Sequence, residues 1–104
     1  LLEDDGFEIG AAATFGEGRD SIVGCIHPQS ILDAIDVIIS RATIPLDAIF
    51  ISCTSLKCAT IIAIAESQFG IPVISSNSAI AWDMARLARM AIPANEKGLL
   101  FQQD

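Results

Sequence analysis

Apolar and polar positions form separate blocks along this chain, and the spacing within each block predicts its secondary structure. Short apolar runs rich in Ile, Val and Phe predict strands. Three such runs are present, at residues 7–15 (FEIGAAATF), 47–52 (DAIFIS) and 71–75 (IPVIS). The last two lack polar alternation, which is typical of parallel strands covered on both faces. Residues 21–26 (SIVGCI) fit either a short strand or an extended connection.

Longer segments between these runs show the helical period of 3.6 residues. A helix is predicted to begin at Pro28, because proline is favoured at the first helical position. Its apolar face consists of Ile31, Ala34, Ile35, Ile38 and Ala42. A second helix is predicted over residues 54–69, which are rich in Ala and Ile and end at Gly70. The order strand, helix, strand predicts a right-handed crossover unit in a parallel sheet.

A third helix is predicted after the last strand, with Ser76 as its N-terminal cap. Asp83 and Arg86 lie one turn apart on its predicted outer face. Its predicted core stripe consists of Ile80, Met84, Leu87 and Ala91. The tail, residues 94–104, carries an apolar group that fits either a docked strand or a contact with a partner: Leu99, Leu100 and Phe101.

Length and charge narrow the class of protein. A chain of 104 residues with 52% hydrophobic side chains has the size and apolar content of one small globular domain. Thirteen acidic against six basic residues give a net charge of −7, which disfavours binding to nucleic acid or to an anionic membrane. No apolar run approaches the roughly 20 residues of a membrane span, and the acidic start does not resemble a signal peptide. We expect a soluble, cytoplasmic protein.

The chain also begins in an unusual way. Residues 1–5 followed by Gly6 look like the last turn of a helix with its C-terminal glycine. The sequence is therefore expected to be a piece of a longer protein.

The three cysteines, Cys25, Cys53 and Cys58, are an odd number without a Cys-x-x-Cys spacing, which indicates reduced thiols. Together with His27 they lack the ligand spacing of a zinc site, so no metal is expected. A phosphatase loop needs an arginine six residues after its cysteine, and Ala59 holds that position after Cys53. Phosphatase chemistry is therefore excluded.

Two polar turns follow the two predicted buried strands, at residues 52–55 (SCTS) and 75–78 (SSNS). Ligands of open parallel sheets bind beyond the carboxyl ends of the strands. Because each turn opens a predicted helix with unpaired N–H groups, the two turns together favour an anion such as a carboxylate. Cys53 lies where a helix N-terminus would stabilise a thiolate, although packing is the other common role of cysteine and position alone leaves both open.

The remaining chemical groups have simpler explanations. Cys25 and Cys58 lie in apolar surroundings typical of packing. A hydrolytic Cys/His pair would require His27 to reach Cys53 from the start of another helix, and a cap or surface role beside Pro28 is the better interpretation. The arginines of the third helix, with Asp83 nearby, are typical of a solvated face.

The run IFISCTSLKCATIIAIAESQFGIPVISSNSAIAWDMARLA resembles the C-terminal half of the aspartate/glutamate/hydantoin racemase superfamily. The similarity is to its maleate isomerase and arylmalonate decarboxylase branch, which includes ectoine-utilisation relatives. It depends on a strand ending in Ser-Cys-Thr, the following helix, the Pro-Val-Ile-Ser-Ser-Asn-Ser run and a Trp-containing helix, and it extends more loosely from Leu1 to about Ala91. The fold implied is a flavodoxin-like three-layer α/β lobe with a parallel sheet, spanning residues 1–104 as half of a two-lobe enzyme.

The resemblance also implies an activity and a site. Enzymes of this superfamily use no cofactor, and most place one cysteine from each lobe at the active site. Cys53 would be the cysteine of the C-terminal lobe, acting as acid or base at an α-carbon. Ser52, Thr54, Ser55, Ser76 and Asn77 are the candidate substrate-binding residues. The cysteine of the other lobe matches no residue of this chain.

The expected function is cofactor-independent isomerisation or racemisation of a small carboxylic acid. Decarboxylation of a substituted malonate is the alternative within enzymes, because it requires only one cysteine. A catalytically silent module that binds a small anion or mediates assembly is the alternative from another class. The expected partners are a small carboxylate substrate and either further copies of the chain or a missing N-terminal lobe; no nucleic acid or membrane partner is expected.

Overall fold

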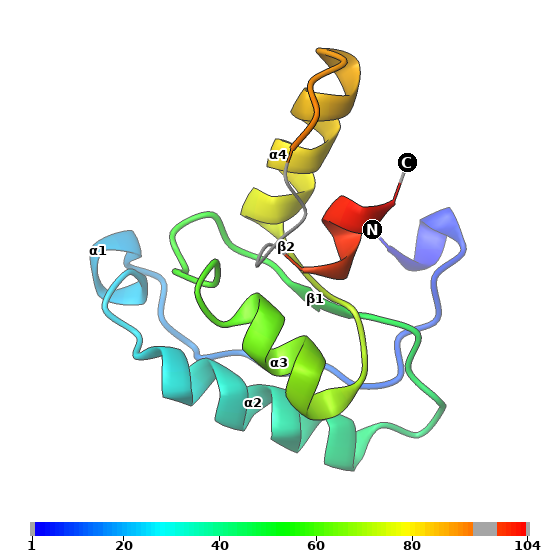
Figure 1. Ribbon diagram of the computed structural model, residues 1–104. Coiled ribbons are helices and arrows are strands. Elements are labelled where there is room, and N and C mark those ends of the chain that lie inside the picture. The colour runs from blue at the N-terminus through cyan, green and yellow to red at the C-terminus, as the bar shows by residue number, and fades with distance from the viewer. Residues whose placement is uncertain (1, 93–97, 104) are drawn as a thin grey trace.

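A computed structural model describes residues 2–92 and 98–103 and shows an α/β arrangement (Figure 1). The elements in chain order are η1 (Glu3–Asp5), α1 (Asp20–Val23), α2 (Pro28–Arg41), β1 (Ile49–Ile51), α3 (Ile62–Phe69), β2 (Val73–Ser75), α4 (Ser76–Leu87) and η2 (Leu99–Gln102).

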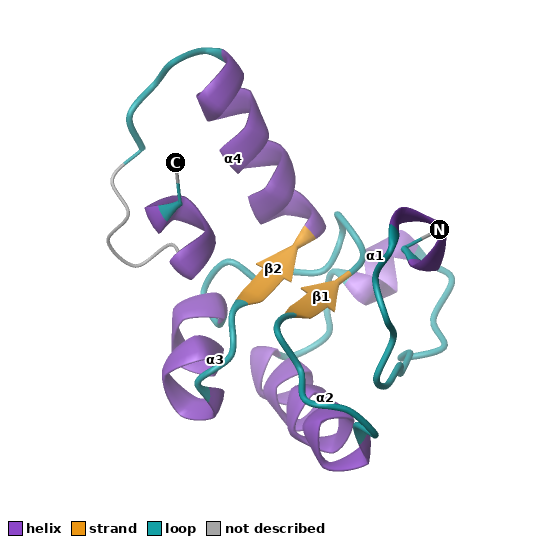
Figure 2. Cartoon of the chain, turned by 90° about the vertical axis from the view of Figure 1, so that its right-hand side faces the viewer, coloured by secondary structure: helices purple, strands orange, loops and turns teal. Residues whose placement is uncertain are grey.

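The sheet of the described residues consists of β1 and β2, which run parallel with Ile49 opposite Val73 and Ile51 opposite Ser75. The chain passes from β1 to β2 through α3, so the predicted strand, helix, strand unit is confirmed. Figure 2 shows α2 and α3 below the sheet and α4 rising from the end of β2. The α/β class and the parallel sheet are thus as the sequence predicts.

The hydrophobic core lies between the sheet and the helices below it. α2 begins at Pro28 and places Ile31 and Ile35 in this core, as its spacing predicts. β2 contributes Val73 and α3 contributes Ala65, which is fully buried. The complete buried cluster comprises Val23, Ile31, Leu32, Ile35, Ile49, Leu56, Cys58, Ile61, Ile62, Ala65 and Val73.

The prediction of a first strand over residues 7–15 is wrong, because this segment is an exposed loop. Gly10 and three alanines offer little apolar surface to bury against a sheet. The backbone instead contacts the connection between α2 and β1: the Thr43 N–H donates to the Gly10 carbonyl at 3.3 Å. β1 therefore has β2 as its one strand neighbour among the described residues. Phe50 is 49% exposed on one face of the sheet, so the prediction that this strand is covered on both faces is wrong.

The second predicted helix, residues 54–69, forms only in its second half. α3 begins at Ile62, and the residues before it form a turn-rich loop. This loop contains Thr and Ser residues, whose side chains compete for backbone hydrogen bonds. It also buries Leu56 and Cys58 in the core, a packing that fixes it in a non-helical path.

The third helix is confirmed as α4, but its predicted core stripe is wrong. Ile80, Met84 and Leu87 are 51%, 64% and 71% exposed, because α4 rises away from the sheet and, within the described residues, meets β2 and η2 rather than the core (Figure 1). The predicted pair on the outer face is present, with Arg86 and Asp83 joined at 2.8 Å.

Three segments outside the main helices and strands adopt short helical turns. Residues 20–23 form the single turn α1, so neither a strand nor an extended connection describes residues 21–26. η1 ends at Gly6 with φ of 89°, as expected for a helical turn closed by glycine. Of the tail, residues 94–97 and 104 lie outside the described residues, and Leu99, Leu100 and Phe101 belong to the 3-10 helix η2. Along the described ranges, each helix is too short or too polar to cross a membrane.

Candidate functional site

The two strand-end turns meet, as the parallel order of β1 and β2 requires. The Cys53 N–H donates a hydrogen bond to Ser76 Oγ at 3.2 Å. Asn77 Nδ2 donates to the Thr54 carbonyl at 2.9 Å. These two bonds span 23 positions of sequence and join the turn after β1 to the start of α4. The structure therefore brings Cys53, Thr54, Ser76 and Asn77 together.

The start of α4 is fixed by reciprocal hydrogen bonds between two serines. Ser75 Oγ accepts from the Ser78 N–H at 3.1 Å, and Ser78 Oγ accepts from the Ser75 N–H at 2.9 Å. This capping box makes Ser75 the N-terminal cap, so the prediction of Ser76 as the cap is wrong. Ser76 is thereby free to face Cys53. The N–H groups of the first turn of α4 lack intrahelical partners, as at every helix N-terminus.

A cavity of about 530 Å³ lies beside these turns. Thr54 and Asn77 line it from the two turns, and Ile62 of α3, Ala81 of α4 and Phe101 of η2 form its apolar walls. The other lining residues are Leu56, Lys57, Cys58, Ala59, Thr60, Ser75, Ser78 and Ile92. A largely apolar cavity with polar groups contributed by the two turns suits a small organic acid.

Cys53 is half-buried and packs against the hydrophobic core, while its neighbour Thr54 lines the cavity. The sequence predicts Cys53 at the N-terminus of its own helix, and this prediction is wrong because α3 begins only at Ile62. The helix start beside Cys53 is instead that of α4, through Ser76. Cys53 thus lies against one helix N-terminus rather than between two.

The other two cysteines have different surroundings. Cys58 is 3% exposed, and burial raises the pKa of its thiol to about 11, with a further contribution from the charge of Cys53. Cys58 belongs to the core, as the sequence predicts. Cys25 is exposed and its thiol donates to the Ser21 carbonyl at 3.3 Å, so the prediction of a packing role for Cys25 is wrong.

The remaining candidates lie at the edge of the site or away from it. Ser52 is exposed and Ser55 is half-buried, and neither lines the cavity formed by the described residues. His27 caps α2 through Nδ1, which accepts from the Gln29 N–H at 3.1 Å, so the cap interpretation is confirmed. Arg86 pairs with Asp83 and lies over the Trp82 ring, as expected for a solvated helix face.

Several residues of the site were missed from the sequence. The Ser-x-x-Ser spacing of Ser75 and Ser78 is a signal for a capping box, and it identifies the true cap. Lys57 lines the cavity because residues 54–61 are a loop, which the predicted helix concealed. Phe101 reaches the cavity from the far end of the chain, and no local pattern indicates such a contact. In the described part of the chain, no three His, Cys, Asp or Glu side chains are grouped to hold a metal ion.

Comparison with known proteins identifies the family of the chain. The family model of arylmalonate decarboxylase matches residues 1–101. A maleate isomerase of Nocardia farcinica is 30% identical over 104 residues, and the match covers 99% of this chain and 40% of that protein. This chain therefore spans well under half the length of the relative.

Solved structures show the same relationship. The Nocardia farcinica maleate cis-trans isomerase bound to TRIS matches with a TM-score of 0.86 and 30% identity, over 99% of this chain and 41% of that one. A cysteine-to-serine mutant of the same enzyme, with a covalently bound succinylcysteine intermediate, matches with a TM-score of 0.85 over the same shares of the two chains. A mutant of arylmalonate decarboxylase, at 24% identity and a TM-score of 0.85, supports the fold. With a family match that covers nearly all of its residues, the chain belongs to the arylmalonate decarboxylase family.

Proposed function

We propose that this chain is the C-terminal lobe of a cofactor-independent enzyme that isomerises or racemises a small carboxylic acid through the thiol of Cys53. The observation that carries the proposal is the junction of the two turns, in which the Cys53 N–H bonds to Ser76 and Asn77 bonds to Thr54. It places the backbone of half-buried Cys53 against the start of a 12-residue helix, and the next residue, Thr54, lines the cavity. The maleate isomerase of Nocardia farcinica is a relative of suitable chemistry.

The substrate carboxylate is assigned to the polar end of the cavity. The backbone N–H groups of the first turn of α4 offer donors with the positive end of that helix dipole behind them. The backbone N–H groups of Thr54 and Ser55 are assigned as further donors from the loop after β1, without a helix dipole of their own. Thr54 and Asn77 line the cavity. Ser52 is exposed one residue before Cys53, and we assign it a contact with the substrate only when the second lobe covers the site. The apolar walls accept the remainder of the molecule.

Cys53 acts in this proposal as a general acid and base. In cis–trans isomerisation of an unsaturated diacid such as maleate, a thiolate of the paired lobe adds to one alkene carbon while the Cys53 thiol protonates the other; the new single bond rotates, and the reverse elimination gives the trans acid. The succinylcysteine intermediate of the Nocardia farcinica isomerase is the product of such an addition.

In racemisation, the Cys53 thiolate takes the proton from the α-carbon, and the electron pair left behind moves into the carboxylate as an enediolate. Donors at the helix N-terminus stabilise that negative charge. Return of a proton to the opposite face of the carbon needs a second group. We assign this group to a paired lobe, which is either a missing N-terminal lobe or another copy of the chain.

Decarboxylation of a substituted malonate is the second candidate, favoured by the family model that matches residues 1–101. In that reaction the bond between the α-carbon and one carboxylate breaks, CO₂ leaves, and the electron pair remains as an enediolate. The Cys53 thiol then protonates the α-carbon. One cysteine is sufficient for this sequence of steps. We further place the protein in the cytoplasm, because its three cysteines are free thiols.

Turnover by the complemented lobe tests the proposal. The chain is mixed with the part of the Nocardia farcinica isomerase that it does not match, and maleate isomerisation and decarboxylation of α-substituted malonates are measured. We expect no turnover by the chain alone and turnover by the pair. Cys53→Ala should then lower the rate about 10²- to 10⁴-fold, the range of general acid–base catalysis. Cys25→Ala is the matched control and should leave the rate unchanged.

Two results contradict the proposal. Turnover by the lone chain that survives Cys53→Ala would show that neither the second lobe nor this thiol is needed. A complemented pair that binds the acids without converting them would favour the silent anion-binding module. The substrate that is converted separates the isomerase from the decarboxylase.

A further inference from the structure

The carboxylate of Glu66 in α3 accepts two backbone hydrogen bonds from distant parts of the chain. Oε1 accepts from the Val73 N–H at 2.9 Å, at the start of β2. Oε2 accepts from the Leu99 N–H at 2.9 Å, at the first residue of η2. Hydrogen bonds to an ionised acceptor are stronger than neutral ones. One side chain therefore ties the C-terminal segment to α3 and to the sheet.

Gly98 provides a second and independent sign that this segment is fitted to α3. It is buried and has φ of 92°, a backbone conformation that favours glycine. A Cβ at this position would lie 2.6 Å from Ile62 Cγ2 and 3.2 Å from Glu66 Oε2. The backbone approaches the helix this closely only because no side chain stands between them.

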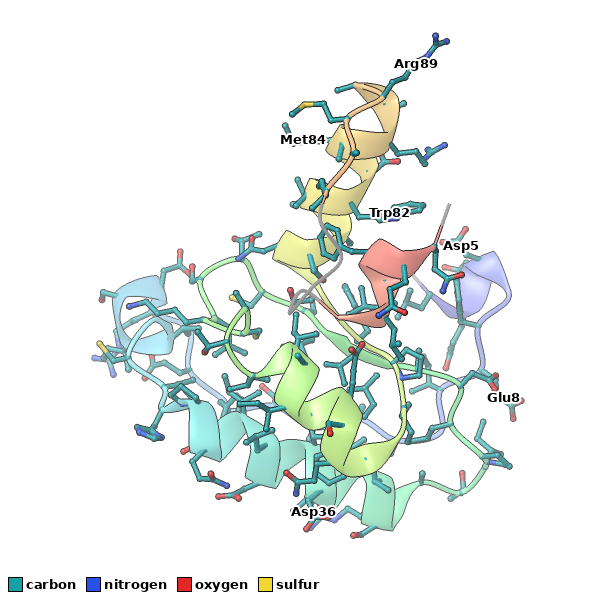
Figure 3. The ribbon with its side chains drawn as sticks, in the orientation of Figure 1. Asp5, Glu8, Asp36, Trp82, Met84 and Arg89 are labelled. Atoms are coloured by element: carbon teal, nitrogen blue, oxygen red, sulfur yellow. The ribbon has the colours of Figure 1, made fainter. Side chains whose placement is uncertain are left out.

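The far end of the segment is held by α4. Trp82 Nε1 donates to the Gln103 carbonyl at 3.4 Å, and Figure 3 shows Trp82 directed to the side of η2, whereas Met84 points away from it. Between the two attachments, Phe101 lines the cavity opposite Ile62 and Ala81. The segment thus forms the wall of the cavity between α3 and α4. The hydrogen bond to the Glu66 carboxylate, at 2.9 Å, is shorter than the one from Trp82, at 3.4 Å, and its acceptor is an acidic group.

We propose that Glu66 is a positioning residue that seats residues 98–103 as a wall of the cavity. The proposal goes beyond the proposed function and does not depend on the reaction. It predicts that loss of the bond to Leu99 moves Phe101 away from the cavity. Cys58, which lines the cavity and is almost completely buried, then becomes accessible to solvent.

Three substitutions disturb the attachment in different ways. Glu66→Gln replaces one acceptor oxygen with an amide donor, so the side chain can no longer accept both hydrogen bonds. Leu99→Pro removes the donor at a position where proline is tolerated, and it leaves the Val73 bond in place. Leu99→Ala is its matched control, because it shortens the same side chain and keeps the N–H. Gly98→Ala introduces the Cβ overlap without changing either partner. Glu8→Gln in the exposed loop and Gly18→Ala, where a Cβ meets nothing within 4 Å, are the matched controls.

Two readouts report the position of the wall. Trp82 is the only tryptophan, so its fluorescence should shift to longer wavelength as its contact with the segment is lost. The alkylation rate of Cys58 should rise at least about tenfold, because loss of a hydrogen bond to a charged group shifts an opening equilibrium by that factor or more. Exposed Cys25 serves as the internal reference in the same sample. Circular dichroism and thermal melting confirm that each variant remains folded.

The double variant with Glu66→Gln and Leu99→Pro should react no faster than the faster single variant, because both changes act through one bond. Folded variants with wild-type Trp82 emission and a wild-type Cys58 rate would overturn the proposal. If Glu66→Gln unfolds the chain, Leu99→Pro decides alone, since it leaves Glu66 and Val73 intact.

Discussion

Because the thiol of Cys58 is buried, the chain should lose stability as the pH rises into the alkaline range. In the folded chain, burial first and the charge of Cys53 second raise the pKa of Cys58 from an ordinary value of 9.0 to about 11. In the unfolded chain the thiol regains the ordinary value and ionises about two pH units earlier. The unfolded state therefore releases its proton first, and rising pH favours unfolding.

The size and the sign of the effect follow from this difference. One pKa unit corresponds to about 1.4 kcal/mol, so a shift from 9.0 to about 11 contributes about 3 kcal/mol. The contribution is fully present below pH 9 and is lost as the pH rises through 11, with roughly half of it lost by pH 10. Folded proteins are stable by only about 5–15 kcal/mol, so a loss of this size is a large fraction of the total and is easy to detect.

Chemical denaturation at a series of pH values measures the effect. The free energy of unfolding of the wild type should fall by about 2 kcal/mol between pH 9 and pH 11 relative to that of Cys58→Ala, out of a total loss of about 3 kcal/mol that is complete only above pH 11. Cys25→Ser is the matched control and should keep the wild-type slope, because Cys25 is exposed. The chain has no tyrosine, so ultraviolet absorbance follows the thiolates directly. Equal losses of stability in the wild type and in Cys58→Ala would refute the reasoning.

Three further predictions concern the stability of individual elements, each measured by chemical denaturation. Ser75→Ala removes the cap of α4 and should cost about 1 kcal/mol, and an unchanged free energy would contradict the capping box. Ile31→Ala in the core should cost about 2–5 kcal/mol, whereas Val37→Ala on the exposed side of the same helix should cost less than about 1 kcal/mol; equal costs would refute the packing. Met84→Gln should change the free energy of unfolding by less than about 0.5 kcal/mol, because Met84 is 64% exposed. A loss of about 2 kcal/mol or more would show that Met84 is buried in the core.

The α/β fold could be predicted where periodicity and burial agree. α2 begins at Pro28 and buries Ile31 and Ile35 because its apolar residues repeat at helical spacing. β1 and β2 lie within the predicted apolar runs. Periodicity failed for α4, because the same spacing describes a stripe that faces a core and a stripe that faces solvent. It failed also for residues 54–61, where burial of Leu56 and Cys58 outweighs helical propensity.

The site could be predicted in outline. The parallel order of the strands was enough to bring Thr54 and Asn77 together, since their turns follow neighbouring strand ends. The side of the cavity built by Phe101 and the anchor Glu66 could not be predicted, because the bond between Glu66 and Leu99 spans 33 positions of sequence and Phe101 reaches the cavity from the far end of the chain. Such contacts leave no local pattern.

The proposed function requires that a carboxylate bind at the junction of the two turns beside Cys53. The alkylation rate of each cysteine, followed by mass spectrometry with and without malonate, tests this binding. Malonate should slow the alkylation of Cys53 and leave that of exposed Cys25 unchanged. An unchanged rate at Cys53 under saturating malonate, or an equal slowing at both cysteines, would contradict it.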